Sequence, residues 1–146
     1  MVHLSRRWWP FRRRACDAAA VGRHGEDLAY WFLRRQGYTI VARNYRAASR
    51  KLGGAGEIDL IAFEGALPTM VFIEVKARAQ EGMFAAESAV NAAKRRHLIR
   101  VARGYRCRRH YTGPYRFDVV VIYGPDDKQP RLTLHRDAFR APCWRS

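Results

Sequence analysis

The stretch that decides the fold runs from Gly56 to Lys76 and reads GEIDLIAFEGALPTMVFIEVK. Two apolar runs within it, 57–63 and 70–76, have the length and the β-branched content of strands. The six residues between them include Gly65 and Pro68 and are too few for a crossover connection. The sequence therefore predicts an antiparallel hairpin.

Charged side chains interrupt the first run at alternate positions. Because residues two apart in a strand share a face, Glu57 and Asp59 are expected to point the same way. Ile58 and Leu60 would then both point into the opposite layer. The first strand thus offers two carboxylates on one face.

The second run adds Glu74 and Lys76, which share a face by the same rule. Carboxylates close together on a half-buried sheet repel each other and raise each other's pKa. A hard cation would neutralise them, and Mg²⁺ is bound by one or two carboxylates while it keeps waters and accepts phosphate oxygens. A lysine beside it can stabilise the charge that develops on a phosphate. The pattern indicates phosphodiester hydrolysis, with a surface ladder of ion pairs as the alternative.

Turn signals and hydrophobic periodicity divide the rest of the chain. Ala29 and Leu33 recur at helical spacing, and Gly37 stands where a C-terminal helix cap belongs. The expected elements are a helix over 22–36, a strand over 38–45, a polar loop over 47–56, a helix over 85–105 and strands over 116–123 and 132–135. The strand over 116–123 is almost continuously apolar, as in strands buried on both faces. With the hairpin, the order is α-β-β-β-α-β-β and the class is α/β.

Length and composition limit the domain organisation and the compartment. A chain of 146 residues with 48% hydrophobic residues forms one folded domain, here residues 22–146, preceded by a flexible basic arm over 1–21. No run approaches the ~20 apolar residues of a membrane span, and no signal-peptide core is present. The three cysteines are widely spaced and are expected to be reduced thiols in a cytoplasmic protein. The five histidines are scattered and are expected to face solvent.

The charge points to a polyanionic partner. Against 13 acidic residues stand 28 basic ones, which give a net charge of +15. Of these, 24 are arginines, so a solvated basic surface that reflects genome composition is the alternative. Residues 26–76 carry a net charge of only +1, whereas no acid interrupts the nine cations between Glu87 and Asp118. The expected nucleic-acid-binding residues are Lys94, Arg95, Arg96, Arg100, Arg103 and Arg78.

An acidic residue on one strand, followed by E-x-K on the next, resembles the pattern D-x(n)-E-x-K of the restriction-endonuclease-like nuclease superfamily. Five motifs occur in the order shown by the YraN-like bacterial family, which is similar to Holliday-junction resolvases. They are GRHGEDLA from Gly22, GEIDLIA from Gly56, FIEVKAR from Phe72, KRR from Lys94 and RFDVVV from Arg116. The resemblance covers about residues 22–140.

This resemblance implies a restriction-endonuclease-like fold, with a mixed central β-sheet flanked by helices. Asp59 and Glu74 would be catalytic metal ligands for Mg²⁺, with Mn²⁺ as a substitute, and Lys76 would be the catalytic lysine. Glu26 would be an outer metal-site carboxylate. Glu57 matches the motif too, and it either faces the metal or holds a basic side chain on a neighbouring strand.

Two further positions match the family. Lys94 corresponds to a basic position that approaches the active site or the scissile phosphate in related nucleases; its alternative is one more cation on a basic helix. Asp118 matches as well, but it lies in the buried-looking strand and is interpreted as structural.

The function that follows is a Mg²⁺-dependent endonuclease that cleaves DNA, with branched or flapped structures as candidate substrates. Contacts to the phosphate backbone carry no sequence information, so binding should be structure-selective or non-specific. Enzymes that cut junctions need two active sites, which makes a homodimer an expectation. The alternative is a nucleic-acid-binding module that keeps the fold but does not cleave, and an assembly or RNA-associated factor is a third possibility.

Overall fold

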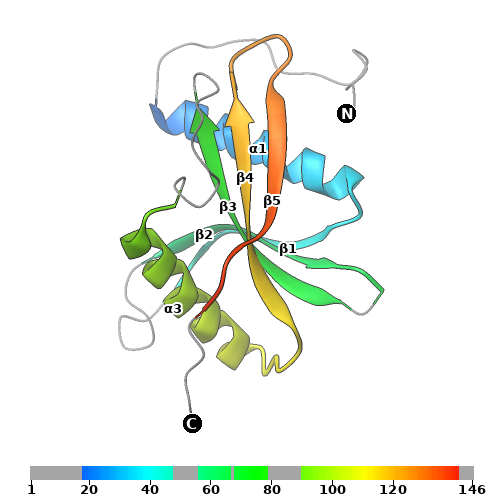
Figure 1. The fold of residues 1–146 in the computed structure, drawn as a ribbon, viewed down its shortest axis with the longest axis vertical. Helices are drawn as coiled ribbons and strands as arrows, with labels where there is room; N and C mark the ends of the chain where they lie inside the picture. The colour runs from blue at the N-terminus through cyan, green and yellow to red at the C-terminus, as the bar shows by residue number, and fades with distance from the viewer. Residues whose placement is uncertain (1–17, 48–55, 67, 79–89, 142–146) are drawn as a thin grey trace.

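A computed structural model describes residues 18–47, 56–66, 68–78 and 90–141 (Figure 1). The elements are α1 (Ala18–Arg35), β1 (Thr39–Arg46), β2 (Glu57–Glu64), β3 (Thr69–Arg78), α3 (Ala92–Arg108), β4 (Tyr115–Tyr123) and β5 (Arg131–Phe139). This order confirms the predicted α-β-β-β-α-β-β arrangement. None of the helices in these ranges is long and apolar enough to cross a membrane.

The five strands form one mixed sheet in the order β1-β2-β3-β4-β5. β2 and β3 pair antiparallel, which confirms the predicted hairpin, and β3 and β4 pair parallel. At one edge of the sheet β1 pairs antiparallel with β2, and at the other edge β5 pairs antiparallel with β4. Parallel neighbours need a crossover connection, and here the segment that contains α3 leads from the end of β3 back to the start of β4.

The two helices cover opposite faces of the sheet (Figure 1). Leu28 and Leu33 of α1 belong to one buried cluster, together with sheet residues such as Ile73. Leu98 and Tyr105 of α3 belong to the other cluster. The sheet is therefore buried on both sides, which explains the nearly continuous apolar runs in β3 and β4.

Both helices begin elsewhere than expected. α1 starts at Ala18, four residues before the predicted Gly22, whereas residues 1–17 of the predicted arm lie outside the described residues. α3 starts at Ala92 rather than Ala85, because the side chain of Asn91 caps it by accepting a hydrogen bond from Lys94 N at 2.8 Å. Residues 85–89 of the predicted helix lie outside the described residues.

The expected cap at the other end of α1 is confirmed. Gly37 has φ 88°, a conformation that residues with a side chain rarely adopt. This turn lets Tyr38 N donate to Leu33 O at 3.1 Å, which satisfies a carbonyl at the helix end. The chain then enters β1 directly.

The expected alternation in β2 is wrong at one position. Ile58 packs in the cluster beneath α3, whereas Leu60 packs in the cluster beneath α1, so the two do not share a face. The regular pairing of β2 with β3 runs from Glu64 and Thr69 to Leu60 and Ile73. The change of face therefore falls at Asp59, between Ile58 and Leu60, next to the end of this ladder.

Candidate functional site

The candidate site lies where β2 leaves β3. At this point Val75 N donates a hydrogen bond of 2.7 Å to Asp59 Oδ2, so a side chain replaces a partner in the ladder. β3 remains paired with β4 as far as Arg78 and Tyr123. The second half of β3 is therefore held firmly on one side, while its other side faces a carboxylate rather than a strand.

Glu74 is the most deeply buried acidic side chain of this site, with 3% of its surface exposed. Its Oε1 lies 2.7 Å from Nζ of Lys76 on the same strand and 3.1 Å from Nζ of Lys94 on α3. Its Oε2 is buried and has no hydrogen-bond partner among the described residues. A buried polar oxygen without a partner carries a desolvation cost of roughly 1–3 kcal/mol, and more when it is charged. This oxygen is suited to a cationic ligand.

Asp59 shares this environment. Burial and then the charge of Glu74 raise its pKa from 3.8 to about 7, against the opposing effects of the Val75 N–H and the Lys94 ammonium. The charge of Glu26 raises the pKa of Asp59 further. The two carboxylates thus repel each other in a desolvated place, as the sequence predicted.

Glu26 reaches this region because α1 packs closely on the C-terminal ends of β3 and β4. A Cβ added at Gly25 would lie 3.5 Å from Ile122 Cδ1 and 3.9 Å from Ala77 Cβ. Glu26 acts on Asp59 through its charge, but in the described ranges no three His, Cys, Asp or Glu side chains gather as a metal-binding group. The structure brings Asp59 and Glu74 together and leaves Glu26 outside that pair.

Glu57 takes up the other arrangement that its motif allowed. Its Oε2 lies 3.0 Å from Nη2 and 3.1 Å from Nε of Arg46, the residue opposite it on β1. The carboxylate is thus engaged by a neighbouring strand. A catalytic role of Glu57 stays a prediction.

The predicted cations divide into three groups. Lys94 belongs to the site through Glu74. Arg95 is half-buried, donates to Val90 O at 2.8 Å and lies 5.8 Å from the centroid of the Phe139 ring. The exposed cations are Arg78 at the end of β3 and Arg96, Arg100 and Arg103 on α3.

Arg96, Arg100 and Arg103 follow one another at intervals of four and three residues, so they share one face of α3. We call these three residues the arginine stripe. The guanidinium of Arg95 points instead to the flank of α3 that faces β5. Arg95 therefore lies apart from the arginine stripe, and its role in binding nucleic acid stays a prediction.

His97 is a residue that the sequence analysis missed. It was expected to face solvent, but it is half-buried, and a Cβ added at Gly56 would overlap its imidazole ring. Burial and the charges of Arg100 and Lys94 lower its pKa, against the charge of Glu74. Its position three residues after Lys94 was the available signal, since such residues share a helix face. The contact with Gly56 is visible only in the folded chain.

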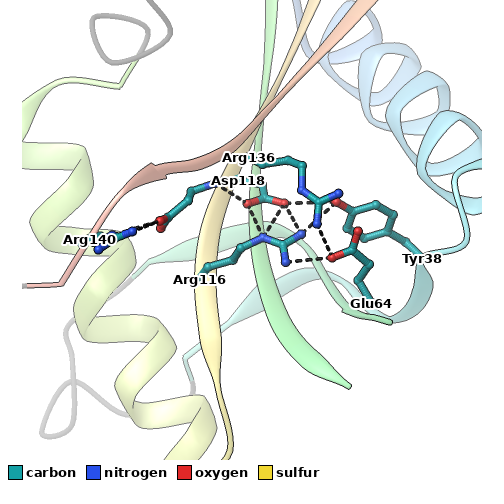
Figure 2. A network of polar contacts seen from close by, with 7 residues as sticks. Tyr38, Glu64, Arg116, Asp118, Arg136 and Arg140 are labelled. Carbon is teal, nitrogen blue, oxygen red and sulfur yellow. Dashed lines mark hydrogen bonds and ion pairs between the residues drawn. The ribbon is translucent and has the colours of Figure 1, made fainter. Parts of the chain in front are cut away.

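Asp118 lies in a separate polar network, as expected for a structural residue (Figure 2). Its side chain is fully buried and pairs with Arg116 on the same strand at 2.9 Å. Tyr38 donates to Asp118 Oδ2 at 3.3 Å, and Asp137 N donates to Oδ1 at 2.9 Å. Burial and then Asp118 raise the pKa of Tyr38 to about 12. This network joins Tyr38, the residue before β1, to β4 and β5 and contains no residue of the candidate site.

Comparison with known proteins gives the family. The model of the uncharacterised protein family UPF0102 matches residues 25–122. The UPF0102 protein of Koribacter versatilis is 45% identical over 119 residues, which cover 82% of this chain and 78% of that protein. The UPF0102 protein of Symbiobacterium thermophilum is 43% identical over 122 residues, which cover 83% of this chain and 97% of that protein. The family expected from the five motifs is confirmed at this level, and the chain belongs to the UPF0102 family.

Proposed function

We propose that this protein is a Mg²⁺-dependent endonuclease of the restriction-endonuclease-like superfamily, which hydrolyses phosphodiester bonds in DNA. The observation that carries the proposal is Glu74. Its carboxylate is buried between two lysines, has one oxygen without a partner and lies beside a second desolvated carboxylate, Asp59. The repulsion between these two carboxylates would not stabilise a purely structural site.

The donor set fits magnesium. Mg²⁺ prefers oxygen ligands and is usually held by one or two carboxylates, with waters and phosphate oxygens completing its shell. Glu74 Oε2 and the carboxylate of Asp59 would hold the ion, which does not require the third carboxylate that Glu26 was expected to supply. When bound, the ion would polarise a phosphate oxygen and make a bound water more acidic.

The chain's own side chains have distinct tasks in this mechanism. Lys76 has 30% of its side chain exposed, so its ammonium can hold the Glu74 carboxylate and also reach a substrate phosphate. There it would stabilise the charge that develops as the bond breaks. Lys94 compensates the same carboxylate from α3 and so fixes the helix against β3.

The arginine stripe supports a nucleic acid as the substrate. These three exposed guanidinium groups lie on the helix that supplies Lys94 to the site, and Arg78 extends the positive charge beyond Lys76 on β3. Arginine pairs well with phosphate oxygens. Backbone contacts of this kind carry no sequence information, so we expect structure-selective or non-specific binding, with branched or flapped DNA as candidate substrates.

A cleavage assay tests the proposal. Linear, flapped and four-way-junction DNAs and structured RNAs are incubated with the protein and Mg²⁺ or Mn²⁺. We expect Lys76→Ala and Asp59→Asn to lower the rate by at least about a hundredfold. The control variants Lys128→Ala and Asp126→Asn change exposed residues in the turn before β5 and should cleave like the parent. Cleavage that survives both site substitutions would rule out this site.

One observation favours the alternative, a binding module that does not cleave. Two lysines already compensate Glu74, and the described part of the chain holds no ready group of three metal ligands. Salt-sensitive DNA binding by the parent without cleavage of any substrate in the panel would support this alternative. Titration calorimetry with Mn²⁺ separates the two cases, because Glu74→Gln weakens metal binding only if the carboxylate is a ligand.

A further inference from the structure

His97 occupies a position between the carboxylate pair and the arginine stripe. It follows Lys94 by three residues and precedes Arg100 by three, so its side chain is a neighbour of both along α3. The charges of Glu74, Lys94 and Arg100 all act on its ring. His97 is therefore the next polar group along the helix after the lysine that binds Glu74.

The ring is seated on the strand that carries Asp59. Gly56 lies immediately before β2, and a side chain there would overlap Nε2 and Cε1 of His97. The backbone at Gly56 is fixed by a hydrogen bond of 3.2 Å from Ala47 N to Gly56 O. A glycine three residues before Asp59 thus creates the space for an imidazole next to the site.

One nitrogen of this ring, Nδ1, is available to a ligand, because Nε2 lies against Gly56. No hydrogen bond joins Nδ1 to any residue in the part of the chain that the structure describes, and the ring is only half-buried. The neutral imidazole donates from this nitrogen when its proton is on Nδ1. Flanking cations and a half-buried donor form a suitable place for a phosphate oxygen.

We propose that His97, seated on Gly56, donates a hydrogen bond to the substrate phosphate next to the scissile one and thereby positions the DNA strand between the arginine stripe and the carboxylate pair. This inference rests on the proposed function, because it assigns a contact to the same substrate. It makes His97 a substrate-binding residue and not the base that activates water.

Binding and cleavage are measured separately to test it. A fluorescein-labelled four-way-junction DNA is titrated with protein in the presence of Ca²⁺, and anisotropy gives the dissociation constant. We expect His97→Ala to weaken binding about tenfold, the size of one lost hydrogen bond to a charged group. His97→Asn keeps an N–H donor at the position of Nδ1 and should stay within about threefold of the parent. In cleavage assays the loss should appear in KM and leave kcat nearly unchanged.

Gly56 provides an independent check of the same contact. Gly56→Ala should displace the ring and weaken binding as much as His97→Ala does, and the double variant should bind no worse than either single variant. His110→Asn is the matched control, since it removes a histidine just after the C-terminal end of α3 at a position with φ 49°, which asparagine tolerates. Thermal melting of each variant confirms that it is folded.

The outcomes distinguish this inference from the proposed function. A parent that binds DNA without cutting it, together with a tenfold weaker His97→Ala, would refute the nuclease and keep the contact. A parent that cuts DNA, together with a folded His97→Ala that binds and cuts equally well, would refute the contact and keep the nuclease. A folded His97→Asn variant as weak as His97→Ala would also overturn the assigned hydrogen bond.

Discussion

Glu74 shares its single buried charge between two ammonium groups through one oxygen atom. Removing one partner of a buried ion pair typically costs about 3–5 kcal/mol, because the other charge is left uncompensated. Here the second lysine limits that cost, so under the proposed function Lys76 would contact a substrate phosphate while Lys94 still compensates the carboxylate. The duplication suits a site in which lysine contacts change during binding.

Asp59 leads to a prediction on pH and stability. Its pKa is about 7 in the folded chain against 3.8 in its ordinary state. Between these values the folded chain holds a proton that the unfolded chain has lost, so the stability contributed by this group is full below pH 3.8 and is lost as the pH rises through 7. Asp59→Asn cannot ionise and avoids this loss. The measurement is the melting temperature of Asp59→Asn minus that of the parent, in EDTA. This difference should increase by roughly 4 °C or more from acidic to mildly basic pH.

The control for this prediction is Asp126→Asn, which alters an exposed carboxylate in the turn before β5. Its melting difference from the parent should stay constant over the same pH range. A constant difference for Asp59→Asn as well would contradict the raised pKa of Asp59. Mg²⁺ added at mildly basic pH should raise the melting temperature of the parent, since a ligand bound only to the folded state stabilises it.

Single residues also mark the limit of sequence analysis. The sequence placed Asp59, Glu74 and Lys76 correctly near one another, because strand periodicity and a short turn are local properties. The sequence left open whether Glu57 faces the metal or a basic side chain on a neighbouring strand. Only the register of β1 and β2 brings Arg46 opposite Glu57. The seat of His97 on Gly56 depends likewise on how α3 lies across the sheet.

At the scale of elements, the start of α3 sets the position of Lys94. The side chain of Asn91 accepts a hydrogen bond from Lys94 N and caps the helix. Asn91→Ala should lower the free energy of unfolding by about 1 kcal/mol, because a backbone donor of the first turn loses its partner. Urea denaturation measures this loss. Asn91→Asp keeps an acceptor oxygen and should retain the parent's stability, whereas an equal loss in both variants would show that the cap is not the cause.

The buried network at the other side of the sheet joins elements that are distant in sequence. Asp118 receives Arg116 of its own strand and the backbone N–H of Asp137 on β5. Asp137 has φ 48°, and the register of β4 and β5 shifts between Phe117 and Val119, so the carboxylate holds an irregularity in the edge strand. This support explains why β5 extends to Phe139, beyond its predicted end at residue 135.

Asp118→Asn tests the importance of this network. We expect it to lower the free energy of unfolding by about 3 kcal/mol, because the Arg116 guanidinium then keeps its charge with less compensation. Urea denaturation is again the measurement, with Asp126→Asn expected to change stability by less than about 0.5 kcal/mol. DNA binding by the folded fraction should not change, since the network lies outside the candidate site. Equal stability of Asp118→Asn and the parent would contradict the structural role.

At the scale of the whole molecule, the net charge of +15 takes on a specific arrangement. Arg95 packs over Phe139, and Arg106 lies 3.7 Å from the centroid of the Tyr115 ring, so part of the positive charge stabilises the packing of α3 on the strands. The arginine stripe remains exposed on another face of the same helix. A net charge counted from the sequence therefore overstates the positive charge that is free of packing contacts on this helix.

The dependence of DNA binding on salt tests this division. Neutralising about six phosphates gives a slope of log affinity against log salt concentration of roughly −5 for duplex DNA. Replacing Arg96, Arg100 and Arg103 together by alanine should reduce the slope by about 3. The matched control replaces Arg23, Arg34 and Arg35, three exposed arginines of α1, and should leave most of the slope intact. Equal reductions in both triple variants would indicate a uniformly charged surface without a preferred face.

The sequence by itself determined the order of the elements and the hairpin, and it predicted the carboxylates and the lysine of the candidate site. These features follow from periodicity, turn residues and charge within short segments, which act before distant parts of the chain meet. Only the tertiary structure decided which cations serve the site, where Glu57 finds its partner and that His97 lies against Gly56. Such contacts join residues on different elements, and they depend on strand register and on the packing of α3, which the hydrophobic pattern leaves open.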